Sequence, residues 1–324
     1  MSKKRNGLRV SADLAGIFAE ENKQPNHREN FTVEKALEIV VSQMEVAGLR
    51  PRTISDYETY VTDFSKKTGT KYMKEFDSGA IYEWLASMSV KPQTKLIRLK
   101  CLRAFLERCF DNGWFIDRFW RHISIRVDTP IKEGATEEEV FALLRILDLS
   151  DFVQLRDAAA VLLMYETGIR LATATNLQEQ HVDLDAKVLR LDGSIMKNRK
   201  SLILPFSERL AQILYALIEQ NRIIRKEKGT RNYLIFITQQ GTKIATSQSS
   251  NNISKRLNLY KRRYGLEHIN PHALRRGFAK DIYSKSHGDI ALVSKALGHS
   301  DFGVTTRYLH LDEEEVADRL REFR

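Results

Sequence analysis

Apolar side chains recur every three or four residues through the first third of the chain, which is the spacing of amphipathic helices. Residues that favour helix ends flank these runs, such as the candidate N-caps Thr32 and Asp77. The pattern predicts four helices. The first runs from Thr32 to about Ala47 and stops at Gly48, the second begins at Thr53, the third follows Asp77, and the fourth runs from Pro92 to Phe110. Residues 31–127 should therefore form a helical domain.

A change of composition marks the end of this domain. The stretch 128–135 has few apolar residues and contains Pro130 and Gly134, which is typical of linkers. Thr136 and the three glutamates that follow it predict a new helix N-terminus. We therefore interpret 128–135 as a linker and 136–324 as a second domain.

The second domain changes from helical to strand-like spacing and back. Helices are expected over 136–148 and 152–166, and strands over 188–191 and 202–204, with Pro205 ending the second strand after a polar turn. Helices return at 207–227 and around 247–264, and three more follow. The predicted fold class is mainly α with a small β-sheet, so that the second domain is α+β.

Both ends of the chain carry a distinct pattern. Residues 1–30 form a basic extension with Lys3, Lys4, Arg5 and Arg9, interpreted either as a loose terminus or as an arm that lies along DNA. Residues 313–324 place Val316, Leu320 and Phe323 on one face of a short amphipathic helix. That helix could cover its own domain or dock on a neighbouring protomer.

Charge narrows the class of partner. The chain of 324 residues holds 52 Lys and Arg against 42 Asp and Glu, a net charge of +10, which favours polyanions such as nucleic acid. The fourth helix carries basic residues that are either DNA-binding candidates or a solvated face: Lys95, Arg98, Lys100 and Arg103.

Other classes of protein are disfavoured by what the sequence lacks. It contains no long apolar run, no signal peptide and no CxxC or HExxH motif, so we expect no membrane span, no metal and no other cofactor. The two cysteines, Cys101 and Cys109, fall on one expected helix and should be free thiols. A cytoplasmic, nucleoid-associated protein is the expectation.

Several short motifs supply groups suited to chemistry on a phosphodiester. A Thr-Gly-Ile-Arg turn ends at Arg170, a His-x-x-Arg pair is formed by His272 and Arg275, and a Leu-Gly-His ends at His299. Tyr308 follows His299 by nine residues, and Lys197 lies in the polar turn, eight residues before Pro205. Guanidinium groups stay charged at any working pH and offer paired donors to phosphate oxygens.

In their order and spacing, these motifs make the chain similar to the tyrosine recombinases, the family of phage integrases and Xer-type resolvases. The resemblance covers about residues 136–312 and, more loosely, the helical part before them. It implies a two-domain clamp around double-stranded DNA, with a SAM-like helical domain that binds the core site and a catalytic domain. It also implies a homotetramer on DNA that exchanges C-terminal helices, with accessory DNA-bending proteins as further partners.

The resemblance implies a role for each motif residue. Tyr308 would attack the phosphorus and form a covalent 3′-phosphotyrosyl link, which conserves the bond energy and needs neither metal nor ATP. Arg170 and Arg275, with a hydrogen bond from His299, would stabilise the charged transition state. His272 would accept or relay the tyrosine proton, and Lys197, or else Lys200, would protonate the leaving 5′-oxygen. Strands would then be exchanged through a Holliday junction, for integration, excision or resolution.

Two positions depart from the family pattern. Thr173 stands where an acidic residue usually follows the first arginine by three positions, so a carboxylate elsewhere, for which we name Glu166, would have to brace the site. Arg276 stands where a histidine often follows the second arginine, and it is a further DNA-binding candidate.

Simpler interpretations stay open at each position. Arg170 could be a surface arginine, His272 a helix cap, Lys197 an ordinary turn lysine and Tyr308 a core tyrosine. The alternatives for the whole chain are a type IB topoisomerase-like enzyme, which relaxes supercoils without paired sites, and a non-catalytic DNA-binding regulator.

Overall fold

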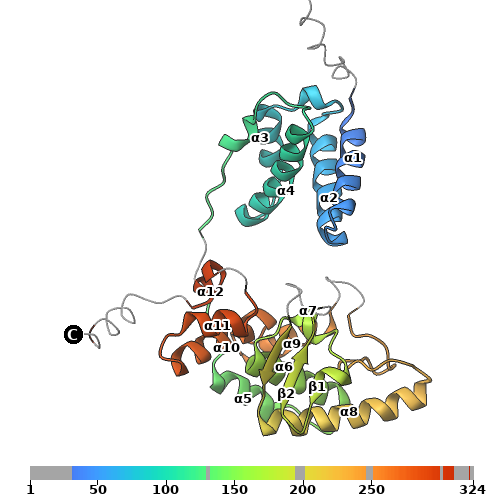
Figure 1. Cartoon of the computed structure of the whole chain (residues 1–324), viewed down its shortest axis with the longest axis vertical. Coiled ribbons are helices and arrows are strands. Elements are labelled where there is room, and N and C mark those ends of the chain that lie inside the picture. Colours follow the sequence, from blue (N-terminus) through green and yellow to red (C-terminus); the bar gives the residue numbers. More distant parts are fainter. Residues whose placement is uncertain are drawn as a thin grey trace, which may run out of the picture. The chain divides into compact units, whose positions relative to one another are not determined.

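The computed structural model describes residues 31–128, 132–193, 201–245, 251–299, 302–309 and Arg321. The chain divides between Thr129 and Pro130 into two compact units, each with its own hydrophobic core (Figure 1). The first unit is helical and the second is helical with a small sheet, which confirms the predicted fold class.

In its described residues, the first unit has four α-helices: α1 (Val33–Val46), α2 (Pro51–Thr68), α3 (Ser78–Ala86) and α4 (Pro92–Asp111). Thr32 and Asp77 cap α1 and α3 as predicted, by accepting backbone N–H bonds from Lys35 and Ala80. The second helix begins two residues before the predicted Thr53, because Pro51 occupies its first position with φ already suited to a helix. Short 3₁₀ turns follow α2 and α4, at Met73–Glu75 and Phe119–His122.

Aromatic residues fill the centre of this unit. Phe64 stacks on Phe76 and meets Trp84 edge-on, and all three are buried. The indole N–H of Trp84 donates to Asp63 at 2.8 Å, which satisfies the one polar atom that the ring carries into the core. Cys101 and Cys109 lie two turns apart on α4 and are free thiols, as predicted.

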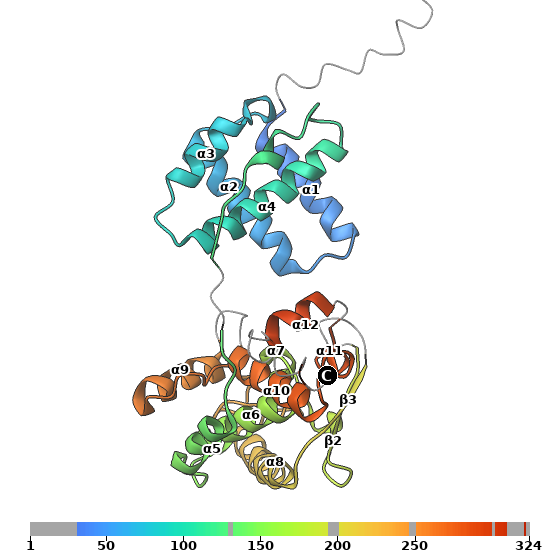
Figure 2. The same cartoon turned by 90° about the vertical axis from the view of Figure 1, so that its left-hand side faces the viewer.

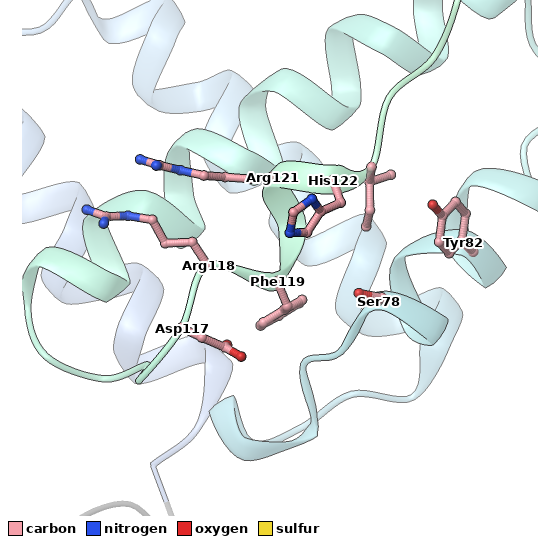
Figure 3. A pocket seen from close by; sticks show the side chains of 8 residues that line it. Ser78, Tyr82, Asp117, Arg118, Phe119, Arg121 and His122 are labelled. Carbon is pink, nitrogen blue, oxygen red and sulfur yellow. The ribbon is translucent and has the colours of Figure 1, made fainter.

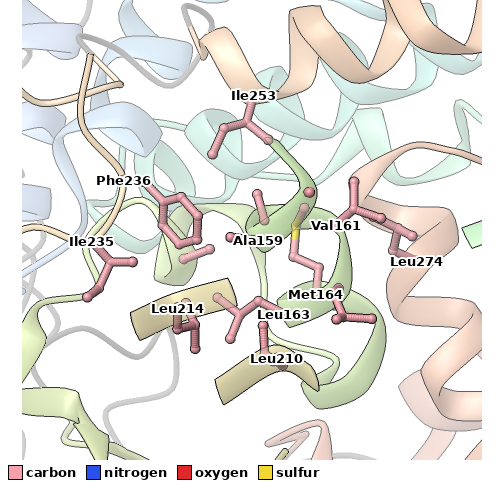
Figure 4. Packing of buried hydrophobic residues seen from close by; sticks show 14 of the residues in the cluster. Ala159, Val161, Leu163, Met164, Leu210, Leu214, Ile235, Phe236, Ile253 and Leu274 are labelled. Atoms are coloured by element: carbon pink, nitrogen blue, oxygen red, sulfur yellow. The ribbon is translucent and has the colours of Figure 1, made fainter. Parts of the chain in front are cut away.

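The second unit is built around α6 (Phe152–Thr167), which is buried on almost every face from Leu155 to Met164. Figure 4 shows its side chains Leu163 and Met164 packed with residues of neighbouring elements. The helices around it are α5 (Glu137–Ile146), α7 (Leu171–Ala174), α8 (Glu208–Lys228), α9 (Asn252–Tyr264) and α10 (Pro271–Lys285).

Three short strands form an antiparallel sheet in the order β1 (Val182–Asp183), β2 (Val188–Leu191) and β3 (Leu202–Pro205). Its register pairs Leu189 with Leu204, and both side chains are buried. The strands β2 and β3 match the predicted hairpin, whereas β1 is an addition of two residues preceded by the 3₁₀ turn Glu179–His181.

The last helices of the described chain are α11 (Ile290–Ala296) and α12 (Phe302–Leu309). Both views show them beside α10, at the end of the unit opposite the long helix α8 (Figures 1 and 2). A small cluster holds the three helices together: Phe278, Ala279, Tyr283, Val293, Leu297 and Leu309.

Two expectations fall outside the described residues. They are the basic extension 1–30 and, except for Arg321, the C-terminal helix 313–324. Within the described part, no helix has both the length and the apolar character needed to cross a membrane.

A buried ionic cluster in the second unit gives a test of this fold. Asp157 on α6 is fully buried and accepts bonds from Arg256 Nε at 2.7 Å, Tyr260 Oη at 2.8 Å and Arg156 Nη2 at 3.0 Å. Asp157→Ala leaves these donors uncompensated in the interior, so we expect it to lower the free energy of unfolding by about 3–5 kcal/mol. Urea unfolding followed by circular dichroism measures this loss.

The matched control removes a carboxylate from an exposed ion pair. Glu219 meets Arg222 at 2.5 Å on the surface of α8. Glu219→Ala should change the free energy of unfolding by less than about 1 kcal/mol, because solvent already screens the pair. Equal losses in the two variants would show that the buried cluster does not hold α6 to α9.

Candidate active site

The turn at the end of α6 positions the first predicted site residue. Gly168 ends the helix with a φ of +60°, and a Cβ atom there would lie 2.2 Å from the ring of Phe278 on α10. Glycine is therefore required both for the backbone conformation and for the close approach of α10. The turn places Arg170 at the N-terminal end of α7, with its side chain partly buried.

The next two predicted residues lie on the first turns of α10. Asn270 caps this helix by accepting from the N–H of Ala273 at 3.0 Å, and Pro271 takes the first helical position. The capping interpretation of His272 is therefore wrong. His272 is exposed, whereas Arg275, three residues further on, is only 3% exposed.

Arg275 joins three segments of the second unit. Its guanidinium donates to the carbonyl of Gly168 at the end of α6 and, through Nη2, to the carbonyl of Leu297 after α11 at 2.7 Å. Nη2 also lies 2.9 Å from Nε2 of His299. A buried charge needs such partners, and here they fix where the guanidinium points.

His299 follows directly on the turn that ends α11. Gly298 has a φ of +62°, and the N–H of His299 returns to the carbonyl of Ser294 at 2.9 Å. On the other side of the ring, Nδ1 lies 2.9 Å from the hydroxyl oxygen of Thr305 on α12. The imidazole thus connects Arg275 on α10 with the helix that carries Tyr308.

Positive charge accumulates around both imidazoles. Burial, followed by the charges of Arg275 and Arg170, lowers the pKa of His299 to about 4. The pKa of His272 is also lowered, first by burial of part of the ring and then by neighbouring cations. The residue as a whole is nevertheless exposed. The cations that act on His272 are Arg276, Arg275, Lys132 and Arg170.

The segment that enters the second unit is fixed to α10 beside these residues. The N–H of Ala135 donates to the carbonyl of Ala273 at 2.9 Å, and Arg276 Nε donates to the carbonyl of Glu133 at 2.8 Å. Gly134 and Gly277 allow the two backbones to touch: a Cβ atom on Gly277 would lie 2.2 Å from the carbonyl oxygen of Ala135. Arg276, expected to contact DNA, thus directs Nε to the protein backbone.

The carboxylate of Glu166 does not take the role expected for it. Its two oxygens accept bonds from the N–H and the hydroxyl of Ser207, at 2.8 and 2.7 Å. Ser207 is the N-cap of α8, just after β3. Glu166 therefore fastens the end of the sheet to α6, and its hydrogen bonds do not go to a site arginine. Thr173, at the usual acidic position, is buried in α7.

Tyr308 can be placed only in part, and the two candidate lysines lie outside the described residues. Tyr308 belongs to α12, one turn beyond Thr305, but its side chain lies outside the described atoms. Lys197 and its fallback Lys200 fall in 194–200, between β2 and β3, which is also outside the described residues.

The basic candidates on α4 have varied surroundings. Lys95 donates to the carbonyl of Leu85 at 2.7 Å, and Arg98 lies over the ring of Tyr60. Lys100 is exposed, and it lines a shallow hollow together with Arg103 and Arg121. Lys100 is thus the candidate most open to solvent, and Arg103, which is half-buried, lines the same hollow.

A second hollow in the first unit lies between α3 and the 3₁₀ turn Phe119–His122 (Figure 3). Arg118 and Arg121 line it, but both guanidinium groups pair with Glu107, at 2.7 and 2.9 Å. Figure 3 shows them extending away from Tyr82 and Ser78. Across the described residues, no group of three or more His, Cys, Asp and Glu side chains is arranged to hold a metal ion.

Sequence reasoning did not anticipate three features of this site. They are the bond of Thr305 to His299, the charge of Lys132 near His272, and the backbone crossing at Gly277. Only Thr305 had a local signal, since it precedes Tyr308 by three residues and so shares a helix face with it.

Comparison with known proteins identifies the family to which this chain is similar. Residues 135–315 match the model of the phage integrase family. The tyrosine recombinase XerC of Psychromonas ingrahamii is 28% identical over 277 residues, covering 82% of this chain and 87% of that protein. XerC of Serratia marcescens is 30% identical over 232 residues, covering 68% of this chain and 70% of that protein.

Solved structures share the fold at low sequence identity. The Tn1549 transposon integrase, in complex with a circular intermediate DNA, has a TM-score of 0.71 at 16% identity, over 90% of this chain and 99% of that one. The XerH site-specific recombinase bound to difH DNA has a TM-score of 0.65 at 21% identity, over 89% and 84%. With the family match spanning more than half of its length, the chain belongs to the phage integrase family, the tyrosine recombinases.

Proposed function

We propose that this tyrosine recombinase cuts and rejoins DNA at specific sites, with Tyr308 as the nucleophile and Arg170, Lys197, His272, Arg275 and His299 as its partners. The observation that carries the proposal is the position of Arg275. Its guanidinium is held by carbonyls from two other segments and by His299, and the charge of Arg170 acts on the same imidazole.

A phosphodiester would gain most from such a site in the transition state. Attack on phosphorus adds negative charge to the nonbridging oxygens, and guanidinium donors already oriented by the fold stabilise that charge without further rearrangement. Removing one preorganised donor of this kind typically slows a reaction by about a hundredfold to a thousandfold. Arg170 and Arg275 are the donors in this proposal.

The depressed pKa of His272 suits a proton acceptor. Burial of part of the ring, and after it nearby cations, lowers this pKa and so favours the neutral imidazole at pH 7, and only the neutral ring has a lone pair to offer. The hydroxyl of a tyrosine ordinarily has a pKa near 10, so Tyr308 needs both this acceptor and the surrounding positive charge to react as a phenolate.

The second half of the reaction follows from the covalent link. A 3′-phosphotyrosyl bond retains the energy of the phosphodiester, so a 5′-hydroxyl can displace the tyrosine and reseal the strand. In the forward direction the leaving 5′-oxygen takes up a proton, which Lys197 supplies in this proposal.

Exchange between two DNA sites needs more than one active site. We propose four protomers on two sites, two successive strand exchanges through a Holliday junction, and docking of residues 313–324 on the next protomer. Integration, excision or resolution of a mobile element or replicon would be the outcome. The solved Tn1549 integrase complex with a circular intermediate DNA supports this kind of role.

Tyr308→Phe tests the nucleophile. The probe is duplex DNA that the purified protein selects from a random-sequence pool, remade with a nick so that a cleaved strand cannot be resealed. The variant lacks the attacking oxygen, so we expect no covalent adduct on a denaturing gel, while binding in a mobility-shift assay stays within about twofold of wild type.

The control for this experiment is Tyr233→Phe, which removes the hydroxyl of a highly exposed tyrosine in the same unit. It should form adduct at the wild-type rate. Adduct on the Tyr308→Phe variant would reject Tyr308 as the nucleophile.

Paired target sites separate recombination from simple relaxation. We expect exchanged products from plasmids that carry two selected sites and none from plasmids without them. Equal relaxation of both plasmids, without exchanged products, would favour the topoisomerase-like alternative. Binding without any covalent chemistry would favour the regulator.

DNA affinity should fall steeply with salt, because phosphate contacts release counterions. Fluorescence anisotropy titrations at about 50 to 200 mM salt measure this dependence. For duplex DNA, each phosphate contact adds about −0.9 to the slope of log affinity against log salt. Replacing both Lys100 and Arg103 with alanine should make the slope shallower by about two.

Lys35→Ala is the matched control for that titration. It removes a lysine of the same unit whose ammonium already pairs with Glu38 at 2.8 Å. Its slope should equal that of wild type. A double variant with an unchanged slope would show that α4 does not bind phosphates.

A further inference from the structure

His299 contacts two helices through its two ring nitrogens. Nε2 lies 2.9 Å from Nη2 of Arg275 on α10, and Nδ1 lies 2.9 Å from the hydroxyl oxygen of Thr305 on α12. The ring therefore bridges the phosphate-binding arginine of the proposed reaction and the helix that carries Tyr308.

The arginine contact decides which nitrogen carries the proton. A guanidinium has only N–H donors, so Nε2 of His299 has to accept and cannot hold a hydrogen. A neutral imidazole then carries its hydrogen on Nδ1, which donates it to the oxygen of Thr305. The lowered pKa of His299, about 4, agrees with a ring that stays neutral near pH 7.

Thr305 is placed firmly enough to accept the hydrogen of this tautomer. Its residue is fully buried, and Leu309, one turn further along α12, packs into the cluster with Phe278 and Leu297. Neighbouring Thr306 is different: it is exposed, and its hydroxyl donates to the carbonyl of Gly303 in its own helix at 3.1 Å.

Helical spacing connects this contact to the proposed nucleophile. Thr305 and Tyr308 are three residues apart on α12, so they occupy adjacent turns on the same side of the helix. A shift of Thr305 away from His299 would move the backbone of Tyr308 with it. A displacement of about 1 Å in a reacting group can slow a reaction by about a hundredfold.

We propose that Thr305 is a positioning residue: its hydroxyl oxygen accepts the Nδ1 hydrogen of His299, supports the tautomer that Arg275 requires, and thereby keeps α12 aligned with Arg275. Its effect on the reaction rests on the proposed role of Tyr308, whereas the tautomer itself does not. Thr305 touches neither DNA nor the reacting atoms in this proposal and acts through His299.

Nitrogen-15 NMR of histidine-labelled full-length protein tests the tautomer without any activity. The His299 signals are identified by their loss in His299→Gln. In wild type at pH 7 we expect a protonated Nδ1 and an unprotonated Nε2. Thr305→Val keeps the shape of the side chain but removes its oxygen, so the Nδ1–H loses its acceptor and the spectrum should show mixed tautomers or a moving ring.

Two variants serve as controls for the spectrum. Thr305→Ser keeps the hydroxyl and should restore the Nδ1–H tautomer, and Thr306→Val makes the same chemical change one residue away and should leave the His299 signals unchanged. A wild-type ring protonated on Nε2, or a Thr305→Val spectrum identical to wild type, would overturn the proposal. A wild-type ring protonated on Nε2 would overturn the proposal even if Thr305→Val folds poorly.

The rate of adduct formation tests the consequence for chemistry. On the nicked DNA probe, Thr305→Val should form adduct about tenfold or more slowly than wild type, with binding unchanged, while Thr305→Ser and Thr306→Val stay within about threefold. An unaltered rate in Thr305→Val would reject the positioning role. If Tyr308→Phe also formed adduct, the proposed nucleophile would fail while the NMR result on Thr305 still stood.

Discussion

The burial of one guanidinium group, that of Arg275, organises the second unit. Arg275 is almost completely removed from water, and a charge in that position is tolerated only with hydrogen-bond acceptors around it. The acceptors come from the end of α6 and from the turn after α11, at Gly168 and Leu297. The two helix ends and α10 therefore have to meet at Arg275, and His299 lies at the same point.

The choice of acceptor matters for chemistry. Main-chain carbonyls orient a guanidinium without cancelling its charge, and that charge adds to the effect of burial in lowering the pKa of His299. The cluster at Asp157 is different, since a carboxylate there neutralises arginines in the core and fixes α6 to α9. One unit thus contains a buried arginine that main-chain carbonyls hold, and others that pair with a buried carboxylate.

Local patterns predicted much of the fold because helix ends and short hairpins are specified by nearby residues. The caps Thr32, Asp77 and Thr136, and the paired strands on either side of 194–200, are examples. The predicted start of α2, at Thr53, was two residues too late, because Pro51 already takes the first helical position. The strand β1 was missed because two residues carry no periodicity.

The site was predictable in its residue types but less so in its contacts. Motif spacing named Arg170, His272, Arg275 and His299, which the structure brings together through charge and hydrogen bonds. Glu166 was wrongly assigned because its partner, Ser207, lies 41 residues away and no local pattern connects them. The hydrogen bond between His299 and Thr305 depends on how α12 packs on α11, which spacing alone does not specify.

The glycine crossing over α10 limits where the protein can bend. Because the backbones touch at Gly134 and Gly277, and Ala135 and Glu133 are hydrogen-bonded to the same helix, this part of the chain moves with α10 as one body. A force on residues 133–135 would therefore reach the helix of His272 and Arg275 through the hydrogen bond between Ala135 and Ala273 and through the side chain of Arg276.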